Sequence, residues 1–140
     1  MARDCAGLFA APPTPLALNA GCSDADIEQA EARLGVAIPA SLAACLQASN
    51  GFTDLAGRYS YGWDLATIVA ENLRAWSDGA TPLARTLLGF GGDGAGGWFC
   101  VPTDARGGVF HWNWIDATAH QVADDVAPFW RSWLTGSLRV

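Results

Sequence analysis

Residues 86–115 read TLLGFGGDGAGGWFCVPTDARGGVFHWNWI, and this stretch decides the fold. It holds three short apolar runs, Thr86–Phe90, Trp98–Val101 and Val109–Ile115, which are separated by segments rich in glycine. Runs of this length between glycine-rich turns are typical of strands. Short connections join antiparallel neighbours, because a parallel pair needs a long crossover. The stretch therefore predicts consecutive antiparallel strands.

The last of these runs has the clearest strand pattern. Successive side chains of a strand point to opposite faces of the sheet. One face would carry the aromatic residues Phe110, Trp112 and Trp114, and the other Val109, His111, Asn113 and Ile115.

Upstream of residue 85 the apolar residues recur at helical spacing instead. Ser23 and Asp64 are suited to cap helix N-termini, and Pro39 is suited to the first position of a helix. Gly35 and Gly51 follow the first two helices, where glycine tolerates the left-handed backbone. We expect three helices here, and between the second and third a loop over residues 52–62 that holds a short strand at most.

A final helix is predicted from Asp124 or Asp125, with Pro128 in its first turn and Gly136 at its end. The order of elements is helices, then short strands, then a helix. This order indicates a single α+β domain with N-terminal helices and a C-terminal helix packed on a mostly antiparallel sheet.

The chain is expected to divide into an N-terminal arm, residues 1–22, and a folded domain, residues 23–140. The arm is rich in alanine and proline and has no clear period. We expect it to be loose and to dock through Leu8, Phe9 and Leu16.

Composition excludes several classes of protein. The chain has 140 residues, of which 51% are hydrophobic and seven are Trp, so it is not disordered and can bury a core. It has no apolar run long enough to span a membrane. The net charge is −6 and lysine is absent, which argues against nucleic-acid binding. The acidity serves solubility alone or complements a basic protein partner.

Metal and cofactor chemistry is not indicated. The four cysteines lie far apart without a Cys-x-x-Cys pair, and the two histidines have no suitably spaced ligands, so no metal site is predicted. Cys45 and Cys100 are expected to be free, buried thiols, and four cysteines are too few for a disulfide scaffold. The N-terminus does not resemble a signal peptide, so we expect a cytoplasmic location.

The glycine-rich turn fits the spacing G-x-G-x-x-G over Gly89–Gly94. A dinucleotide site needs a helix directly after these glycines, but a strand-like run follows, and without lysine a phosphate-binding Walker motif is impossible. No nucleophile motif is present either. We predict no cofactor and no catalytic residue, and keep a small-molecule or nucleotide site at this turn as an alternative.

The tryptophans are the most unusual feature. Those on helical stripes are expected in the core, whereas others lie near the glycine-rich turn, where they either fill the core or form a contact surface. The predicted partner-binding residues are Trp63, Asp93, Trp98, Trp112 and Trp114.

Several segments in the same order resemble the SUKH superfamily of Smi/Knr-like proteins. The first is Ser23–Pro39, an acidic helix followed by Leu-Gly, an apolar residue and Pro. The others are Leu42, Leu46 and Asn50-Gly51; Leu88–Phe90 before Asp93-Gly; Val109–Trp112; and Val122–Phe129.

The resemblance implies an α+β domain without catalytic chemistry. Bacterial members are mostly immunity proteins that neutralise a cognate toxin, and eukaryotic relatives act in cell-wall regulation and signalling. We therefore expect a protein-binding domain that occludes a toxin. The alternative is a regulatory or scaffold protein that binds a host protein. The sequence predicts no oligomeric state.

Overall fold

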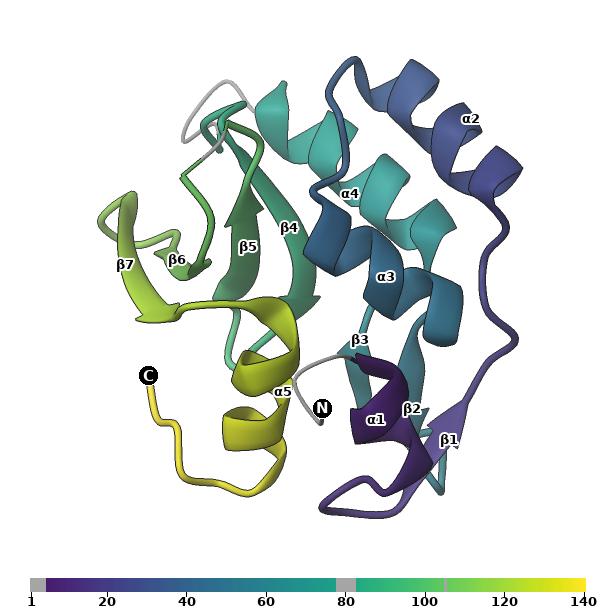
Figure 1. The fold of residues 1–140 in the computed structure, drawn as a ribbon. Coiled ribbons are helices and arrows are strands. Elements are labelled where there is room, and N and C mark those ends of the chain that lie inside the picture. The colour runs from purple at the N-terminus through teal and green to yellow at the C-terminus, as the bar shows by residue number, and fades with distance from the viewer. Residues whose placement is uncertain (1–4, 78–82, 105) are drawn as a thin grey trace.

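The computed structural model describes residues 5–77, 83–104 and 106–140. Within them, helices accompany a seven-stranded sheet whose strands follow chain order from β1 to β7, each pair antiparallel. The α+β prediction is confirmed. Figure 1 shows α5 at the lower ends of β4 and β5, with α4 beside β4 and α2 outside α4. In the described part of the chain, no helix is long and apolar enough to cross a membrane.

Helix α2 (Asp24–Leu34) begins and ends as the sequence predicts. The Ser23 hydroxyl accepts the Asp26 N–H, and the Asp26 carboxylate accepts the Ser23 N–H, which forms a capping box. Gly35 ends the helix in the left-handed region, with φ of 75°. Helix α3 (Ala40–Ala48) begins one residue later than predicted, because Pro39 is its N-cap and not its first residue.

The Asn50-Gly51 pair ties the end of α3 to the start of α4 (Leu65–Trp76). The Asn50 Oδ1 atom accepts the Leu65 N–H at 2.7 Å. Gly51 has φ of 77°, and a Cβ there would lie 2.7 Å from the backbone nitrogen of Asp64. Only glycine fits this close approach. Asp64 caps α4 as predicted, because its carboxylate accepts the Thr67 N–H at 2.8 Å.

Helix α4 takes the place of a missing strand beside β4 (Leu87–Gly92). Strand β3 pairs with β4 only where Gly62 lies opposite Gly91, so the first half of β4 has no strand on that side. The Asn72 side chain occupies this place. Its Oδ1 accepts the Gly89 N–H at 2.7 Å, and its Nδ2 donates to the Gly89 carbonyl at 2.8 Å. Nδ2 also donates to the Ile68 carbonyl at 2.7 Å, so this buried amide is satisfied.

Trp76 adds one more hydrogen bond between α4 and β4. Its Nε1 donates to the Leu87 carbonyl at 3.1 Å. The apolar stripe predicted for this helix is confirmed at Leu65, Ile68 and Val69, which are buried. The buried Asn72 within that stripe is not recognisable from the apolar pattern.

The N-terminal segment is more ordered than the loose arm that we expected. Residues 5–22 contain helix α1 (Cys5–Ala10) and strand β1 (Leu16–Leu18), which pairs with β2 (Phe52–Asp54). Leu8 and Phe9 are buried and Leu16 is half-buried. Residues 1–4 of the arm lie outside the described residues.

A disulfide joins Cys5 to Cys45, with 4.9 Å between the two Cα atoms. The prediction that Cys45 is a free thiol is therefore wrong, whereas Cys22 and Cys100 are free and buried. The sequence could not reveal the pair, because the fold brings together two helices whose cysteines are 40 positions apart.

The remaining strands differ from the predicted ones in their bounds. The expected loop at 52–62 is a hairpin of β2 and β3 (Ser60–Gly62). Strand β4 begins one residue later and ends two residues later than the predicted run, and β5 (Trp98–Pro102) ends one residue later. Strand β6 (Val109–Asn113) ends two residues early, which leaves Trp114 and Ile115 in the turn to β7 (Thr118–Ala123). The sequence does not predict strand β7, because Val122 is the only large apolar residue among its six.

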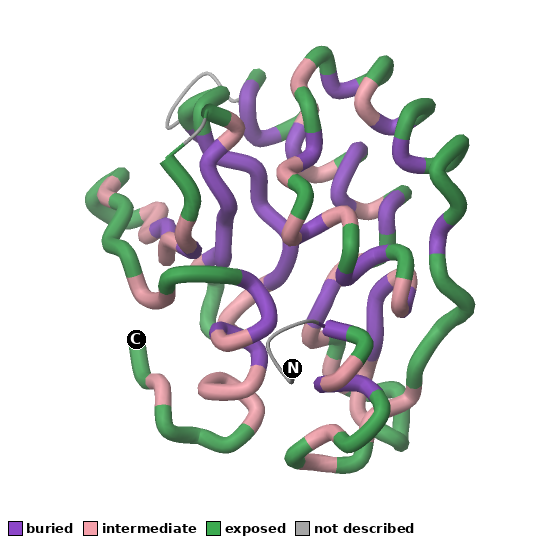
Figure 2. Tube along the Cα trace, in the orientation of Figure 1, coloured by how far each residue is buried: buried purple, intermediate pink, exposed green. Residues whose placement is uncertain are grey.

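Helix α5 (Val126–Leu134) closes the core. Asp125 is its N-cap, and Pro128 lies in its first turn as predicted. Phe129 packs against Phe99 with 4.5 Å between ring centroids, and Trp130 lies against Phe90. Figure 2 shows β4 and β5 buried along most of their length, and β7 mainly exposed or half-buried.

Replacing Asn72 with Ala should lower the free energy of unfolding by about 3 kcal/mol, since buried polar groups of Gly89 would lose their partners. Urea unfolding measures this loss. Glu71→Ala is the matched control on the same helix, because it breaks only a surface ion pair. Equal stability of the two variants would contradict the role of Asn72.

Replacing Cys5 with Ala should lower the free energy of unfolding by about 4 kcal/mol, as the chain-entropy account gives for a closed loop of this length. A reductant should weaken the wild-type protein by a similar amount and leave the variant unchanged. If the wild-type protein unfolds identically with and without reductant, the disulfide does not hold α1.

Candidate functional site

Four of the five predicted partner-binding residues meet on one side of the sheet. Trp98 is central: its ring centroid lies 4.8 Å from that of Trp63 and 4.9 Å from that of Trp114. Trp114 in turn lies 5.7 Å from Trp112. All three contacts are close to perpendicular, the edge-to-face arrangement that aromatic quadrupoles favour. We call these four residues the tryptophan face.

The tryptophan face lies on the side of the sheet away from α5. Phe99 points toward α5, where it contacts Phe129 and Trp133. Trp98 is its neighbour on the same strand, so its side chain points to the opposite side. Trp112 shares this side with Trp98, because the two residues are paired across β5 and β6.

Gly89 makes room for the centre of the face. A Cβ at this position would lie 2.6 Å from the Trp98 ring and 3.4 Å from the Trp63 ring. Any side chain at this position would therefore displace Trp98. Gly89, whose backbone binds the Asn72 side chain, is thus also the residue against which the Trp98 ring packs.

The four tryptophans differ in exposure. Trp98 and Trp112 are buried, with 8% and 6% of their surface exposed, whereas Trp63 and Trp114 are half-buried. Ile115, beside Trp114 in the chain, is 96% exposed. The accessible members are therefore Trp63 and Trp114, with Ile115 beside them, whereas Trp98 and Trp112 are covered.

Two further features of this face were not recognised from the sequence. The Arg74 guanidinium of α4 lies 6.0 Å from the Trp98 ring centroid, at the outer limit of a cation–π contact. Nε1 of Trp112 is buried and has no hydrogen-bond partner among the described residues. The Arg74 contact has no sequence signal, because it joins segments that are far apart in the chain.

Asp93, the fifth predicted residue, lies apart from the tryptophan face. It accepts the backbone N–H groups of Ala95 and Gly97 at 2.7 and 3.0 Å, and its Oδ2 lies 2.8 Å from Nε2 of His111. His111 packs beside Phe99, so the pair belongs to the side that α5 covers. The glycine-rich segment is a turn that Asp93 organises between β4 and β5.

Burial of the Asp93 carboxyl acts to raise its pKa, but hydrogen bonds from His111 and from two backbone N–H groups outweigh burial. The pKa of Asp93 is therefore below its ordinary value. A strand follows this turn, as predicted, so no helix N-terminus is available there to hold a phosphate.

A sequence model of the SMI1 / KNR4 family (SUKH-1) matches residues 21–132. The chain belongs to this family. No curated protein matches the sequence. Members of the SUKH family are generally toxin-immunity proteins, and the domain is typically non-catalytic. The match confirms the resemblance carried by the segment from Ser23 to Phe129.

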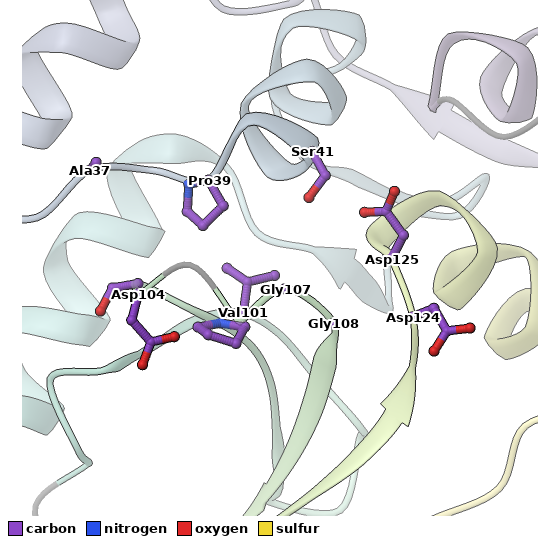
Figure 3. Close-up of a pocket in the computed structure, with 11 residues that line it drawn as sticks. Ala37, Pro39, Ser41, Val101, Asp104, Gly107, Gly108, Asp124 and Asp125 are labelled. Atoms are coloured by element: carbon purple, nitrogen blue, oxygen red, sulfur yellow. The ribbon is translucent and has the colours of Figure 1, made fainter.

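This SUKH-1 domain also has an open pocket of about 540 Å³ that the sequence did not reveal. It lies between the start of α3, the β5–β6 turn and the junction of β7 with α5. Figure 3 shows Asp104 on one side of the pocket and Asp124 and Asp125 on the other. Asp104 binds Arg106, and Asp125 accepts the Val126 N–H, so two of these carboxylates have structural partners.

The hydrogen bond from Arg106 holds the pKa of Asp104 below its ordinary value. The pocket is acidic and therefore suits a cationic group. Among the residues described by the structure, no three His, Cys, Asp or Glu side chains are grouped to hold a metal ion.

Replacing Asp93 with Asn should cost about 2 kcal/mol of stability near pH 7, because a charged hydrogen-bond acceptor is lost. A carboxyl with a lowered folded-state pKa stabilises above its unfolded-state pKa, and this contribution is lost as the pH falls through the folded-state value. The difference between wild-type and variant should therefore shrink as the pH falls below the ordinary aspartate pKa and disappear below the lowered folded-state pKa of Asp93.

Urea unfolding at several pH values measures this difference. Asp104→Asn is the matched control: its carboxyl also has a lowered pKa, but it is exposed, so the loss should be much smaller. A loss for Asp93→Asn that does not vary with pH would contradict this account of the turn.

Proposed function

We propose that this SUKH-1 domain is an immunity protein that binds a cognate bacterial toxin and neutralises it by occluding its active site. The observation that carries the proposal is the tryptophan face. It is a cluster of large aromatic side chains on a sheet surface away from α5, and its outermost members are only half-buried. The mechanism is binding, and the protein contributes no chemical step.

The physical reason is the energy that a tryptophan contributes to a protein interface. Its side chain buries a large area and has few rotatable bonds, so little conformational entropy is lost on binding. Trp63 and Trp114 are already held in place by contacts with Trp98. A rigid, pre-positioned aromatic surface loses less entropy on association than a mobile one.

The charge of the domain supports a basic partner. The net charge is −6, and a toxin directed at nucleic acid carries a basic surface to bind phosphates. Opposite charge would speed the encounter and make it sensitive to salt. We do not assign a catalytic role to the acidic pocket, because Asp104 and Asp125 serve an ion pair and a helix cap.

We propose a cytoplasmic location, where a nucleic-acid-directed toxin would act. The structure pairs Cys5 with Cys45, whereas a reducing cytoplasm disfavours disulfides. A cytoplasmic location therefore requires that these two thiols are free in the cell and form the disulfide only after isolation. Alkylation before lysis, followed by mass measurement, tests this prediction. Two unmodified, paired cysteines in freshly trapped protein would place the domain in an oxidising compartment instead.

The partner itself is tested by affinity capture from the native host. The tagged domain is washed at low and at high salt, and a stoichiometric toxin-like domain that is held more tightly at low salt would support the proposal. Capture of a housekeeping protein would favour the regulatory or scaffold alternative. If nothing is retained at either salt concentration, the immunity function is wrong, and nucleotides and other small ligands become the next candidates for binding at the Asp93 turn.

Replacing Trp114 or Trp63 with Ala should weaken binding of the captured partner by about 30-fold or more, the effect expected for interface hot spots. Titration calorimetry measures this, and circular dichroism confirms folding. Trp133→Ala is the matched control, since Trp133 is also half-buried but lies on the α5 side. Equal affinities for all three variants would remove the tryptophan face from the interface.

A further inference from the structure

The two edges of the sheet are protected very differently. Strand β1 has three residues and directly follows Pro15, so it offers little unpaired backbone to another strand. Strand β7 has six residues, none of them proline or charged. Natural edge strands are usually shortened, charged, or covered, because an open edge pairs with other chains. Among the described residues, β7 is neither shortened nor charged nor covered. Its pairing with β6 does shift register near Val122, which lies between the partners of Val109 and Phe110, so the regular part of the edge is Thr118–Gln121.

The middle of β7 is open on both faces. Ala119, His120 and Gln121 are exposed, and consecutive residues of a strand point to opposite faces. Figure 1 shows β7 at the outer side of the sheet, with no drawn element beyond it. The Thr118 N–H donates to Asp116 and the Ala123 carbonyl accepts from the Gln121 side chain, both at 3.2 Å. The outer backbone groups between these two ends are available to an incoming strand.

The two ends of this uncharged strand are acidic. Asp116 lies in the turn before β7, and Asp124 and Asp125 follow it directly; all three are exposed. Arg106 lies in the same region, but both of its contacts are intramolecular, with the Asp104 carboxylate and the Phe110 ring. The edge therefore presents a neutral backbone between two negative ends.

This charge pattern opposes pairing with a second copy of the chain. In an antiparallel pair of β7 strands, Asp116 of each copy would lie beside Asp124 and Asp125 of the other. Like charges at this proximity destabilise an interface. The same pattern favours an extended segment with basic residues at its ends.

We propose that β7 is a docking edge for an extended segment of the toxin, which adds as an eighth strand of the sheet. The proposal rests on the proposed function for the existence of a protein partner. The segment would have about eight residues, as the spacing from Asp116 to Asp124 requires, with Arg or Lys near both ends. One basic side chain would enter the acidic pocket, which Asp124 and Asp125 line.

This arrangement divides the binding energy between two sources. Main-chain hydrogen bonds along β7 supply affinity that does not depend on the sequence of the segment. The flanking charges fix its position along the edge and accelerate association. The β6–β7 turn connects this edge to the tryptophan face, because it contains both Trp114 and Asp116.

Hydrogen–deuterium exchange of the complex with the captured toxin tests the docking edge. The backbone amides of residues 118–123 that point away from β6, about every second residue, should exchange at least tenfold more slowly in the complex, whereas those of β1 should not change. If the toxin binds and exchange in β7 is unaltered, the docking edge is wrong and the immunity function stands.

Association kinetics at low salt give a second readout. Asp124→Asn should slow association at least threefold more than Glu28→Gln, which removes another exposed carboxylate, this one on α2 and outside the docking edge. Equal rates for the two variants would contradict the role of the acidic ends.

A probe independent of the toxin separates the two proposals. The probe is an eight-residue synthetic peptide of alternating threonine and valine with arginine at both ends, and its control has glutamate at both ends. Perturbation of β7 amide resonances by the first peptide alone would support the docking edge even if capture fails. No perturbation by either peptide, or equal perturbation by both, would overturn it.

Discussion

The attachment of α4 to β4 through Asn72 is the interaction on which the rest of the structure depends. Strand β3 is too short to cover the first half of β4, so buried backbone groups of Gly89 need another partner. The Asn72 amide supplies both a donor and an acceptor and is itself satisfied by Ile68. A buried amide outside such a complete network would destabilise the core. The helix therefore functions as part of the sheet.

The tryptophan face follows from the same constraint. Gly89 presents its backbone to Asn72 and an open surface to Trp98, and any side chain there would displace the ring. Trp98 then holds Trp63 and Trp114 at its edges. Trp98 and Trp112 are buried and support the face, whereas Trp63 and Trp114 at its rim are accessible. A partner would thus meet aromatic side chains whose positions are set by the fold of the sheet.

The positions of the charged side chains matter in this protein as well as its net charge. The strands that carry the core, β4 and β5, have no charged residue, and most of the described aspartates lie in turns and at helix starts. The glutamates lie on α2 and α4. Asp26 and Asp93 use their charge for local hydrogen bonds, and both have lowered pKa values because backbone or His111 groups bind them. Asp116 and Asp124 flank an uncharged edge strand instead. Some carboxylates therefore stabilise the fold, and others are exposed where a partner could contact them.

The sequence by itself determined the helices that have caps and strict periods, the antiparallel strands after residue 86, and the family. Ser23, Gly35 and Asp64 act within one turn of the chain, so their effect is local and can be predicted. Only the tertiary structure revealed the Cys5–Cys45 disulfide and the two hydrogen bonds between the Asn72 side chain and the Gly89 backbone, because these join segments far apart in the chain. It also separated Asp93 from the four tryptophans, since strand alternation sends neighbouring side chains to opposite sides of the sheet. Strand β7 is held by pairing with β6 and not by its own apolar pattern, so its position at the open edge became visible only in the folded chain.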